Sequence, residues 1–248
     1  MNQKSTVLSQ KQMATLLAML IALMPLSIDA YLPAIPNMAE SLGADIHRIE
    51  QSLSTFLLGV AAGQLVGGSL SDIKGRRVIA LSGLVVFIIA TFGLAAVQTG
   101  EQLLMLRMVQ AFGAGMTVVV VGAVVRDQYE GREAAQMFAL IGIILMIAPL
   151  IAPLAGAGLQ ALGGWRLIFV SLAVYAMVVW GLLLRFVSKP IKIEPLSAGF
   201  MRGVLMRYLR VFKTRIALGF LFFQAFSFSS MFVFLTESPF IYIELYGV

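Results

Sequence analysis

The stretch Gly68-Ser-Leu-Ser-Asp72-Ile-Lys-Gly75-Arg76-Arg77 places three cations in a short turn between two long apolar runs. Lys and Arg resist translocation across a bilayer, so a basic turn between apolar segments indicates the cytoplasmic face of a membrane protein. A soluble protein has no comparable reason to confine cations to such a turn. The stretch therefore predicts two membrane-spanning helices that meet at the cytoplasmic surface.

The composition excludes most classes of soluble protein. Of the 248 residues, 60% are hydrophobic and only 12% are charged, whereas about a quarter of the residues in a typical soluble domain are charged. The net charge of +6 does not indicate nucleic-acid binding, because the cations lie in loops between apolar segments. We therefore expect the lipid bilayer to be a partner of this chain, and nucleic acid not to be one.

Seven apolar segments are long enough to cross a membrane as helices, for which about 20 residues are needed. They are residues 13–35, 52–71, 78–97, 103–125, 136–159, 166–187 and 216–238. No segment alternates with a period of two, so the pattern predicts helices and not a β-barrel. The first segment contains Pro25, Asp29 and Pro33 and lacks a signal-peptide cleavage pattern, so we expect it to be a retained helix. The predicted fold class is an all-α membrane protein.

The basic residues indicate how these helices are oriented. All but three of the 18 Lys and Arg residues fall on one side of the predicted membrane, the exceptions being Arg48, Arg107 and Arg166. The positive-inside rule assigns that side, and with it the N-terminus, to the cytoplasm.

The segment 188–215 mixes Lys and Arg with large apolar residues, most clearly from Met201 to Phe212. One interpretation is an amphipathic helix on the anionic inner leaflet. The other is an ordinary basic linker between two groups of helices. The two interpretations are compatible, and the linker is favoured.

Two charged residues lie inside apolar segments, where a charge is costly unless it is paired or faces water. Counted from the outer ends of their helices, Asp29 lies about 9 Å deep and Arg107 about 6 Å deep. Their helices run in opposite directions, so the side chains reach a similar depth and can meet. The functional interpretation is a proton-coupled substrate site, because an acid in the membrane changes its protonation readily. The alternative is a structural ion pair that joins two helices.

Other residues of the apolar segments are candidates either for a transport cavity or for helix packing. Proline removes a helical hydrogen bond, and interrupted helices line the cavities of many transporters. Such prolines are Pro25, Pro33, Pro149 and Pro153. Polar residues suited to a cavity, and equally to hydrogen bonds between helices, are Tyr31, Gln64, Gln110 and Thr117.

Small residues at helical spacing predict close contact between helices. Gly59, Gly63, Gly67 and Ser71 form a ladder on one face of the second segment. Such ladders let the backbone of another helix approach closely. We interpret this ladder as a packing surface.

The sequence contains no pattern typical of an enzyme or a metal site. The chain has no cysteine and a single histidine, His47, which lies in a polar stretch without a second ligand at metal-binding spacing. Neither a Ser/His arrangement nor paired carboxylates occur. We expect no cofactor, no metal and no enzymatic activity.

Two stretches of the sequence resemble motifs of the major facilitator superfamily. Gly68-x3-Asp72-x2-Gly75-Arg76-Arg77 resembles motif A, although Ile73 stands where a polar residue is common. Leu103-x3-Arg107-x2-Gln110-Ala111-x-Gly113 resembles motif B, with Ala111 in place of glycine. Each motif falls where the family has it, so their combination is more specific than either alone.

Two further motifs resemble those of drug exporters in this family. The stretch from Ala148 to Gly156, with Pro149 and Pro153, resembles motif C, the antiporter signature. Pro25-Leu-Ser-Ile-Asp29-Ala-Tyr31-Leu-Pro33 resembles the acidic motif of the first helix. With Tyr129 after Arg126-Asp127, and with Gly164-Trp165-Arg166-x2-Phe169, the sequence looks like the Bcr/CflA branch of bacterial multidrug exporters.

The resemblance implies part of a twelve-helix transporter, in which two six-helix bundles are joined by a cytoplasmic loop. The implied domains are an N-terminal six-helix bundle over 1–187, a basic linker over 188–215 and the first helix of a C-terminal bundle over 216–248. The chain would then be truncated, and the missing bundle would be required for transport. The implied location is the bacterial inner membrane.

The resemblance also implies roles for individual residues. Asp29 would bind the proton and a cationic substrate, and Arg107 would modulate its proton affinity. Pro149, Pro153 and Gly156 would shape the cavity and restrict leak. The cytoplasmic gate would consist of motif A and its charge partners, namely Gly68, Asp72, Gly75, Arg76, Arg77, Arg126 and Asp127.

These expectations favour a proton-coupled antiporter that exports small amphipathic or antibiotic-like molecules, with the substrate and protons as its partners. Inward movement of a proton would protonate Asp29 and release the drug outward. The alternative is a truncated, non-transporting fragment or an interaction subunit of such a transporter. Import of a metabolite is disfavoured by the resemblance to motif C.

Overall fold

The computed structural model describes residues 10–186 and 200–239, which form helices joined by short turns. These residues fall into two compact units, one that ends with helix α7 and one that contains helices α8 and α9. No β-strand occurs among the described residues. The predicted boundary between the first domain and the linker lies outside the described residues.

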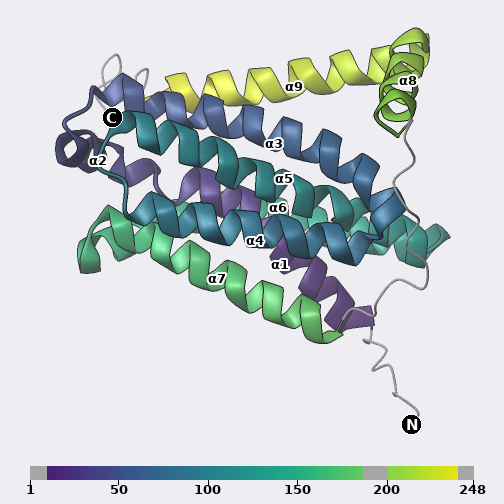
Figure 1. The fold of residues 1–248 in the computed structure, drawn as a ribbon, viewed down its shortest axis with the longest axis horizontal. Coiled ribbons are helices and arrows are strands. Elements are labelled where there is room, and N and C mark those ends of the chain that lie inside the picture. Colours follow the sequence, from purple (N-terminus) through teal and green to yellow (C-terminus); the bar gives the residue numbers. More distant parts are fainter. Residues whose placement is uncertain (1–9, 187–199, 240–248) are drawn as a thin grey trace. The chain divides into compact units, whose positions relative to one another are not determined.

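Within the described residues, six helices are long and apolar enough to cross a membrane, and all six belong to the first unit (Figure 1). They are α1 with its continuation (Lys11–Leu42), α3 (Ile46–Lys74), α4 (Arg76–Ala95), α5 (Gly100–Gln128), α6 (Gly131–Gly163) and α7 (Trp165–Phe186). They lie where the first six spans are predicted, which confirms the all-α membrane fold. Several extend beyond their apolar runs because polar residues cap them. The side chains of Asp45 and Thr99 accept backbone hydrogen bonds at the starts of α3 and α5.

The first predicted span, 13–35, is not one continuous helix. α1 covers Gln10–Asp29 and is followed by the 3-10 turn η1 (Leu32–Ala34) and the short helix α2 (Ile35–Leu42). Pro33 explains the break, because it has no N–H to donate to the carbonyl of Asp29, four residues earlier. Pro25 lies inside α1 and does not end it.

Helix α5 runs between α3 and α4 and packs against both (Figure 1). Glycines permit its approach to α3, because a Cβ atom at Gly59, Gly63 or Gly67 would run into the backbone of α5. On α5 itself, Gly115 lies equally close to α3 and Gly113 lies close to α4. The predicted ladder of small residues is thus the contact surface between α3 and α5.

The outer surface of the first unit is largely apolar, as a bilayer requires. On α6, the side chains of Met146, Leu150, Leu154 and Leu162 are each more than 70% exposed. The buried residues of α6 form a single stripe, consisting of Met137, Ile141, Ala148, Ala152 and Gly156. A helix with so much exposed apolar surface needs lipid or another protein element around it.

The second unit contains α8 (Phe200–Lys213) and α9 (Arg215–Pro239). α9 occupies the segment for which the seventh span is predicted, and its exposed side chains include Phe220, Phe223 and Phe226. That α9 crosses the membrane stays a prediction. α8 lies inside the segment 188–215, for which an amphipathic helix is one of the two interpretations.

Candidate functional site

Most cations of the first unit lie at the end where α3, α5 and α7 end and α4 and α6 begin. We call this the basic end and the other the opposite end. The cations at the basic end include Lys74, Arg76, Arg77, Arg126, Arg132 and Arg185. The candidate site residues form one group nearer the opposite end, around Arg107, and a second group at the basic end.

Arg107 lies in α5 and is the largest fully buried side chain among the described residues. Its Nη1 atom donates hydrogen bonds to the carbonyl oxygen of Ser27, at 3.0 Å, and to Oε1 of Gln110, at 2.8 Å. Its guanidinium carbon lies 4.3 Å from the ring centre of Tyr31 and 4.5 Å from that of Phe56. These cation–π contacts surround the cation with groups from α1, α3 and the turn that follows α1.

Asp29 is the last residue of α1 and its side chain is half buried. Among the described residues, its carboxyl group forms no ion pair with Arg107, which contacts the carbonyl of Ser27 instead. The direct ion pair considered from the sequence is therefore not formed.

Arg107 nevertheless lies at the level of Asp29, because it contacts Ser27 and Tyr31 on either side of that residue. Its Nε and Nη2 atoms have no hydrogen-bond acceptor in the part of the chain that the structure describes. A buried guanidinium with unused donors thus contacts two residues that flank Asp29 in the sequence.

Three of the four predicted cavity residues form contacts between helices in this arrangement. The hydroxyl groups of Tyr31 and Ser52 share a hydrogen bond of 2.8 Å, and Nε2 of Gln110 donates to Oγ1 of Thr91 at 3.0 Å. The hydroxyl of Thr117 donates to backbone carbonyls of its own helix and of α4. All three candidate side chains are at most 1% exposed, so none lines an open cavity here.

The fourth predicted cavity residue, Gln64, is half buried on α3. Its helix face is the one that meets α5, since a Cβ atom at Gly115 would approach the backbone nitrogen of Gln64. The position is compatible with either interpretation of this residue.

Several partners in the group around Arg107 are not among the sequence candidates. Ser52 and Thr91 are polar residues inside apolar segments, a signal by which they can be identified. Ser27 contributes its backbone carbonyl and Phe56 contributes its ring. No residue type or spacing in the sequence indicates those two contacts.

At the basic end, the turn between α3 and α4 is built around Gly75 and Arg76. Gly75 has a φ of +90°, which favours glycine. Arg76 donates to Oδ1 of Asp72 at 2.5 Å, to the hydroxyl of Ser71 at 2.5 Å and to Oδ2 of Asp127 at 3.0 Å. One guanidinium therefore joins the end of α3 to the end of α5.

The remaining members of the predicted gate have different surroundings. Nη2 of Arg77 donates to the carbonyl of Leu184 at 2.6 Å, which joins α4 to the end of α7. Gly68 is half buried in α3. Arg126 is exposed and forms no ion pair with any described residue. Of the two predicted charge partners, the structure thus brings only Asp127 to Arg76.

The α6 residues of the antiporter-like motif face α1. Ala148, Ala152 and Gly156 are the buried residues of this stretch, and a Cβ atom at Gly156 would collide with the carbonyl of Ala30. Pro149 and Pro153 are half buried, and α6 continues through both. A close contact between α6 and the residue that follows α1 therefore lies directly beside Asp29.

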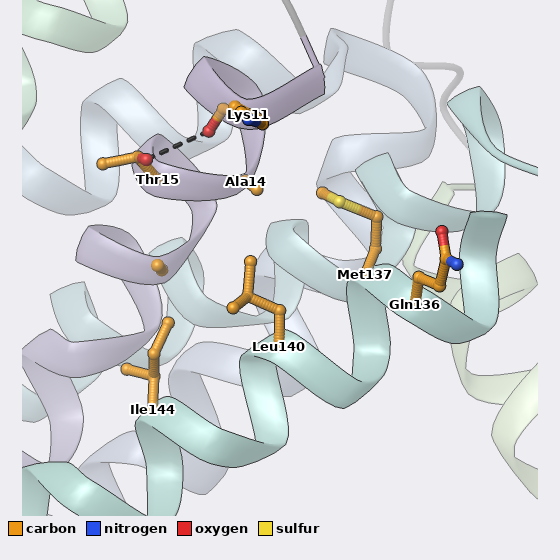
Figure 2. A pocket seen from close by; sticks show the side chains of 8 residues that line it. Lys11, Ala14, Thr15, Gln136, Met137, Leu140 and Ile144 are labelled. Carbon is orange, nitrogen blue, oxygen red and sulfur yellow. Dashed lines mark hydrogen bonds between the residues drawn. The ribbon is translucent and has the colours of Figure 1, made fainter.

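Further toward the basic end, α1 and α6 border an open pocket of about 530 Å³ (Figure 2). It is lined by Lys11, Ala14, Thr15, Ala18, Gln136, Met137, Leu140 and Ile144. Figure 2 shows Met137 and Leu140 projecting from α6 on one side and Lys11 and Thr15 on α1 across from them. Its wall is mainly apolar, with polar groups from Lys11, Thr15 and Gln136.

A family model described as Major Facilitator Superfamily matches residues 17–248. Three curated bacterial relatives are named for drug resistance. The sequence is 29% identical over 232 residues to a bicyclomycin resistance protein homolog of Haemophilus influenzae, covering 94% of this chain and 58% of the relative. It is 41% identical over 148 residues to a chloramphenicol resistance protein of Pseudomonas aeruginosa, covering 59% and 35%. It is 30% identical over 229 residues to the multidrug resistance protein MdtL of Shigella dysenteriae, covering 92% and 57%.

Solved structures of transporters match the fold. A peptide transporter, POT, matches with a TM-score of 0.62 and 16% identity, covering 92% of this chain and 50% of that one. The human organic anion transporter MFSD10 matches with a TM-score of 0.59 and 18% identity, covering 77% and 51%. At these identities the likeness concerns the fold alone. The chain spans about half of these structures and less than two thirds of each curated relative.

Proposed function

This chain belongs to the major facilitator superfamily, and from that premise we propose that it is the proton-binding half of an exporter of small amphipathic molecules. Members of the family move small molecules across membranes, and the chain is a multi-pass membrane protein. Its curated relatives are named for resistance to bicyclomycin, to chloramphenicol and to multiple drugs. We assign the export of such compounds, driven by protons, to the transporter of which this chain forms a part.

The observation that carries this proposal is the position of Asp29. Its half-buried carboxyl lies where α1 is interrupted, and interrupted helices form the substrate sites of many secondary transporters. A single carboxylate binds either a proton or the cationic group of a drug, so the arrival of one releases the other. Arg107 contacts Ser27 and Tyr31, which flank Asp29 in the sequence, and has unused donors. We assign these donors the stabilisation of the Asp29 carboxylate between the two states.

The proposed orientation places the basic end in the cytoplasm, because Lys and Arg resist translocation. The pocket between α1 and α6 then lies on the cytoplasmic side, on the helix that carries Asp29. A drug that arrives from the cytoplasm meets this pocket before it reaches the carboxyl. We assign the pocket a role in the first contact with substrate.

The network around Arg76 supports the proposed cytoplasmic gate. Asp72 and Asp127 both pair with Arg76 and retain about half of their side-chain exposure. Their carboxylates therefore remain accessible to another partner, such as a helix N-terminus of a second bundle, where a negative charge is favoured. Alternating access requires such a second bundle. We propose residues 1–187 as the first bundle, 188–215 as the linker and 216–248 as the start of the second.

The test is the accumulation of ethidium, a cationic amphipathic dye, in bacteria that lack their own exporters. One strain carries this chain joined to the second half of a curated relative, and its control carries the empty vector. We expect lower accumulation in the first strain, and a return to the control level when an uncoupler removes the proton gradient. Equal accumulation in both strains, with the protein present in the membrane, would contradict the proposal.

A further inference from the structure

Helix α8 separates charged from apolar positions. At about 100° per residue, the Lys and Arg positions 202, 207, 210 and 213 fall on one side of the helix. Most apolar positions fall on the other, namely 200, 201, 204, 205, 208, 209, 211 and 212, and Met206 is the exception on the charged side. The side chains of Leu209 and Phe212 are 45% and 59% exposed, although both are large and apolar. This face is therefore available to an apolar partner.

The connection to α9 indicates where an apolar partner of α8 would lie. A single residue, Thr214, separates α8 from α9, and its hydroxyl donates to the carbonyl of Arg210 at 3.1 Å. The backbone N–H of Leu218 donates to the carbonyl of Thr214 at 3.0 Å. α8 thus lies within a few ångströms of the start of α9 and turns steeply away from it (Figure 1). Beside an α9 that crosses the membrane as predicted, a helix that turns steeply away from it would lie near the membrane surface.

We propose that α8 binds the anionic phospholipids of the cytoplasmic leaflet, a role that rests on the proposed orientation and on α9 as the seventh span. The residues on its apolar face, including Leu209 and Phe212, enter the boundary between headgroups and acyl chains. Arg210 and Lys213, on the charged face, lie at the level of the lipid phosphates. Charge complementarity selects this partner, because α8 contains four cations and no acidic residue.

The absence of cysteine from the chain permits single spin labels without other changes. The whole chain is placed in phosphatidylcholine bilayers with and without phosphatidylglycerol, and labels are attached at Phe212→Cys, Arg210→Cys and Phe226→Cys. Oxygen reports contact with lipid, and a water-soluble nickel chelate reports contact with water. In anionic bilayers we expect oxygen to relax the labels at 212 and 226 and nickel to relax the label at 210.

Charge neutralisation tests the role of the lipid headgroups. In the chain labelled at 212, the changes Arg210→Gln and Lys213→Gln together should reduce the oxygen effect to the value seen in neutral bilayers. The matched control, Arg132→Gln, removes an exposed cation from the first unit and should leave the oxygen effect unchanged. Equal values in neutral and anionic bilayers, or no response to the double change, would overturn the proposal.

The label at 226 separates this proposal from the orientation on which it rests. Contact of position 226 with water would show that α9 is not a span, and the proposal for α8 would fall with it. Contact of position 226 with lipid, together with contact of position 212 with water, would overturn the proposal for α8 alone. A failure of drug export changes none of these readings, because Asp29 lies in the first unit.

Discussion

Arg107 shows how a single residue connects the packing of this protein to its proposed chemistry. An arginine without any exposed surface is rare unless its charge is matched. Here the match comes from a backbone carbonyl, an amide oxygen and two aromatic rings, and not from an ion pair with a carboxylate. We propose that this cation stabilises the charge of Asp29 when that residue loses its proton.

We predict that Arg107→Ala destabilises the fold by about 3 kcal/mol or more, the scale of removing the largest core side chains. The change removes a fully buried side chain and leaves the carbonyl of Ser27 and the amide of Gln110 without their donor. The measurement is the unfolding midpoint of the chain in detergent, followed by circular dichroism.

The matched control for this change is Arg48→Ala. Arg48 is 41% exposed and pairs with Glu101 across the starts of α3 and α5, so its loss should cost about 1 kcal/mol or less. Equal midpoints for the two variants would show that the buried cation does not hold the helices together.

The candidate site could be predicted from the sequence only in part. Asp29 and Arg107 are recognisable because charges in apolar segments are costly, and their similar depth follows from counting residues. Their relative rotation is not recognisable, because the contact between α1 and α5 determines whether Arg107 meets Asp29 or the carbonyl of Ser27. The same limit applies to Tyr31, Gln110 and Thr117, whose residue types fit a cavity and a helix contact equally well.

At the scale of elements, glycines and prolines determine how the helices meet. The helix positions could be predicted because a run of about 20 apolar residues has few alternatives to a membrane helix. Pro33 marks an interruption near the break in α1, but the apolar run continues past it and does not show where the helix ends. The ladder from Gly59 to Gly67 predicts a close contact, but only the structure identifies α5 as the partner.

We predict that Gly156→Val separates α1 from α6 and destabilises the first unit by about 1–3 kcal/mol, the usual cost of overpacking. The new Cβ atom would collide with the carbonyl of Ala30, a backbone atom that cannot move away alone. The measurement is again the unfolding midpoint in detergent.

The control for this variant lies two residues further along α6. A Cβ atom at Gly158 meets no atom within 4 Å, so Gly158→Val introduces the same side chain without a collision. The free energy of unfolding of this variant, obtained from its midpoint, should stay within about 0.5 kcal/mol of that of the unchanged chain. If the midpoint of Gly158→Val were as low as that of Gly156→Val, the destabilisation would come from the loss of a glycine and not from the collision with Ala30.

At the scale of the whole molecule, the proposed function depends on which end of the first unit faces the cytoplasm. The basic end holds the network around Arg76 and lies on the same side as the pocket between α1 and α6. The family supplies the fold, and the chain spans about half of the transporters with that fold. The orientation itself follows only from the distribution of cations.

Single cysteines test this orientation directly, since the chain has none of its own. Gln98 and Gln128 are both exposed and lie at the opposite end and the basic end, respectively. In intact spheroplasts, a membrane-impermeant thiol reagent should label Gln98→Cys and leave Gln128→Cys unlabelled until the membrane is permeabilised. The reverse pattern would show that the basic end faces outward.

The central claim is that Asp29 exchanges a proton for the cationic group of a drug. The most direct measurement is the release of protons when a cationic drug is added, in weakly buffered detergent solution, to the purified transporter completed by a second bundle. We expect proton release from the unchanged protein and from Asp127→Asn, whose carboxyl belongs to the network at the basic end, and no release from Asp29→Asn. Proton release from a folded Asp29→Asn variant, equal to that of the unchanged protein, would contradict the claim.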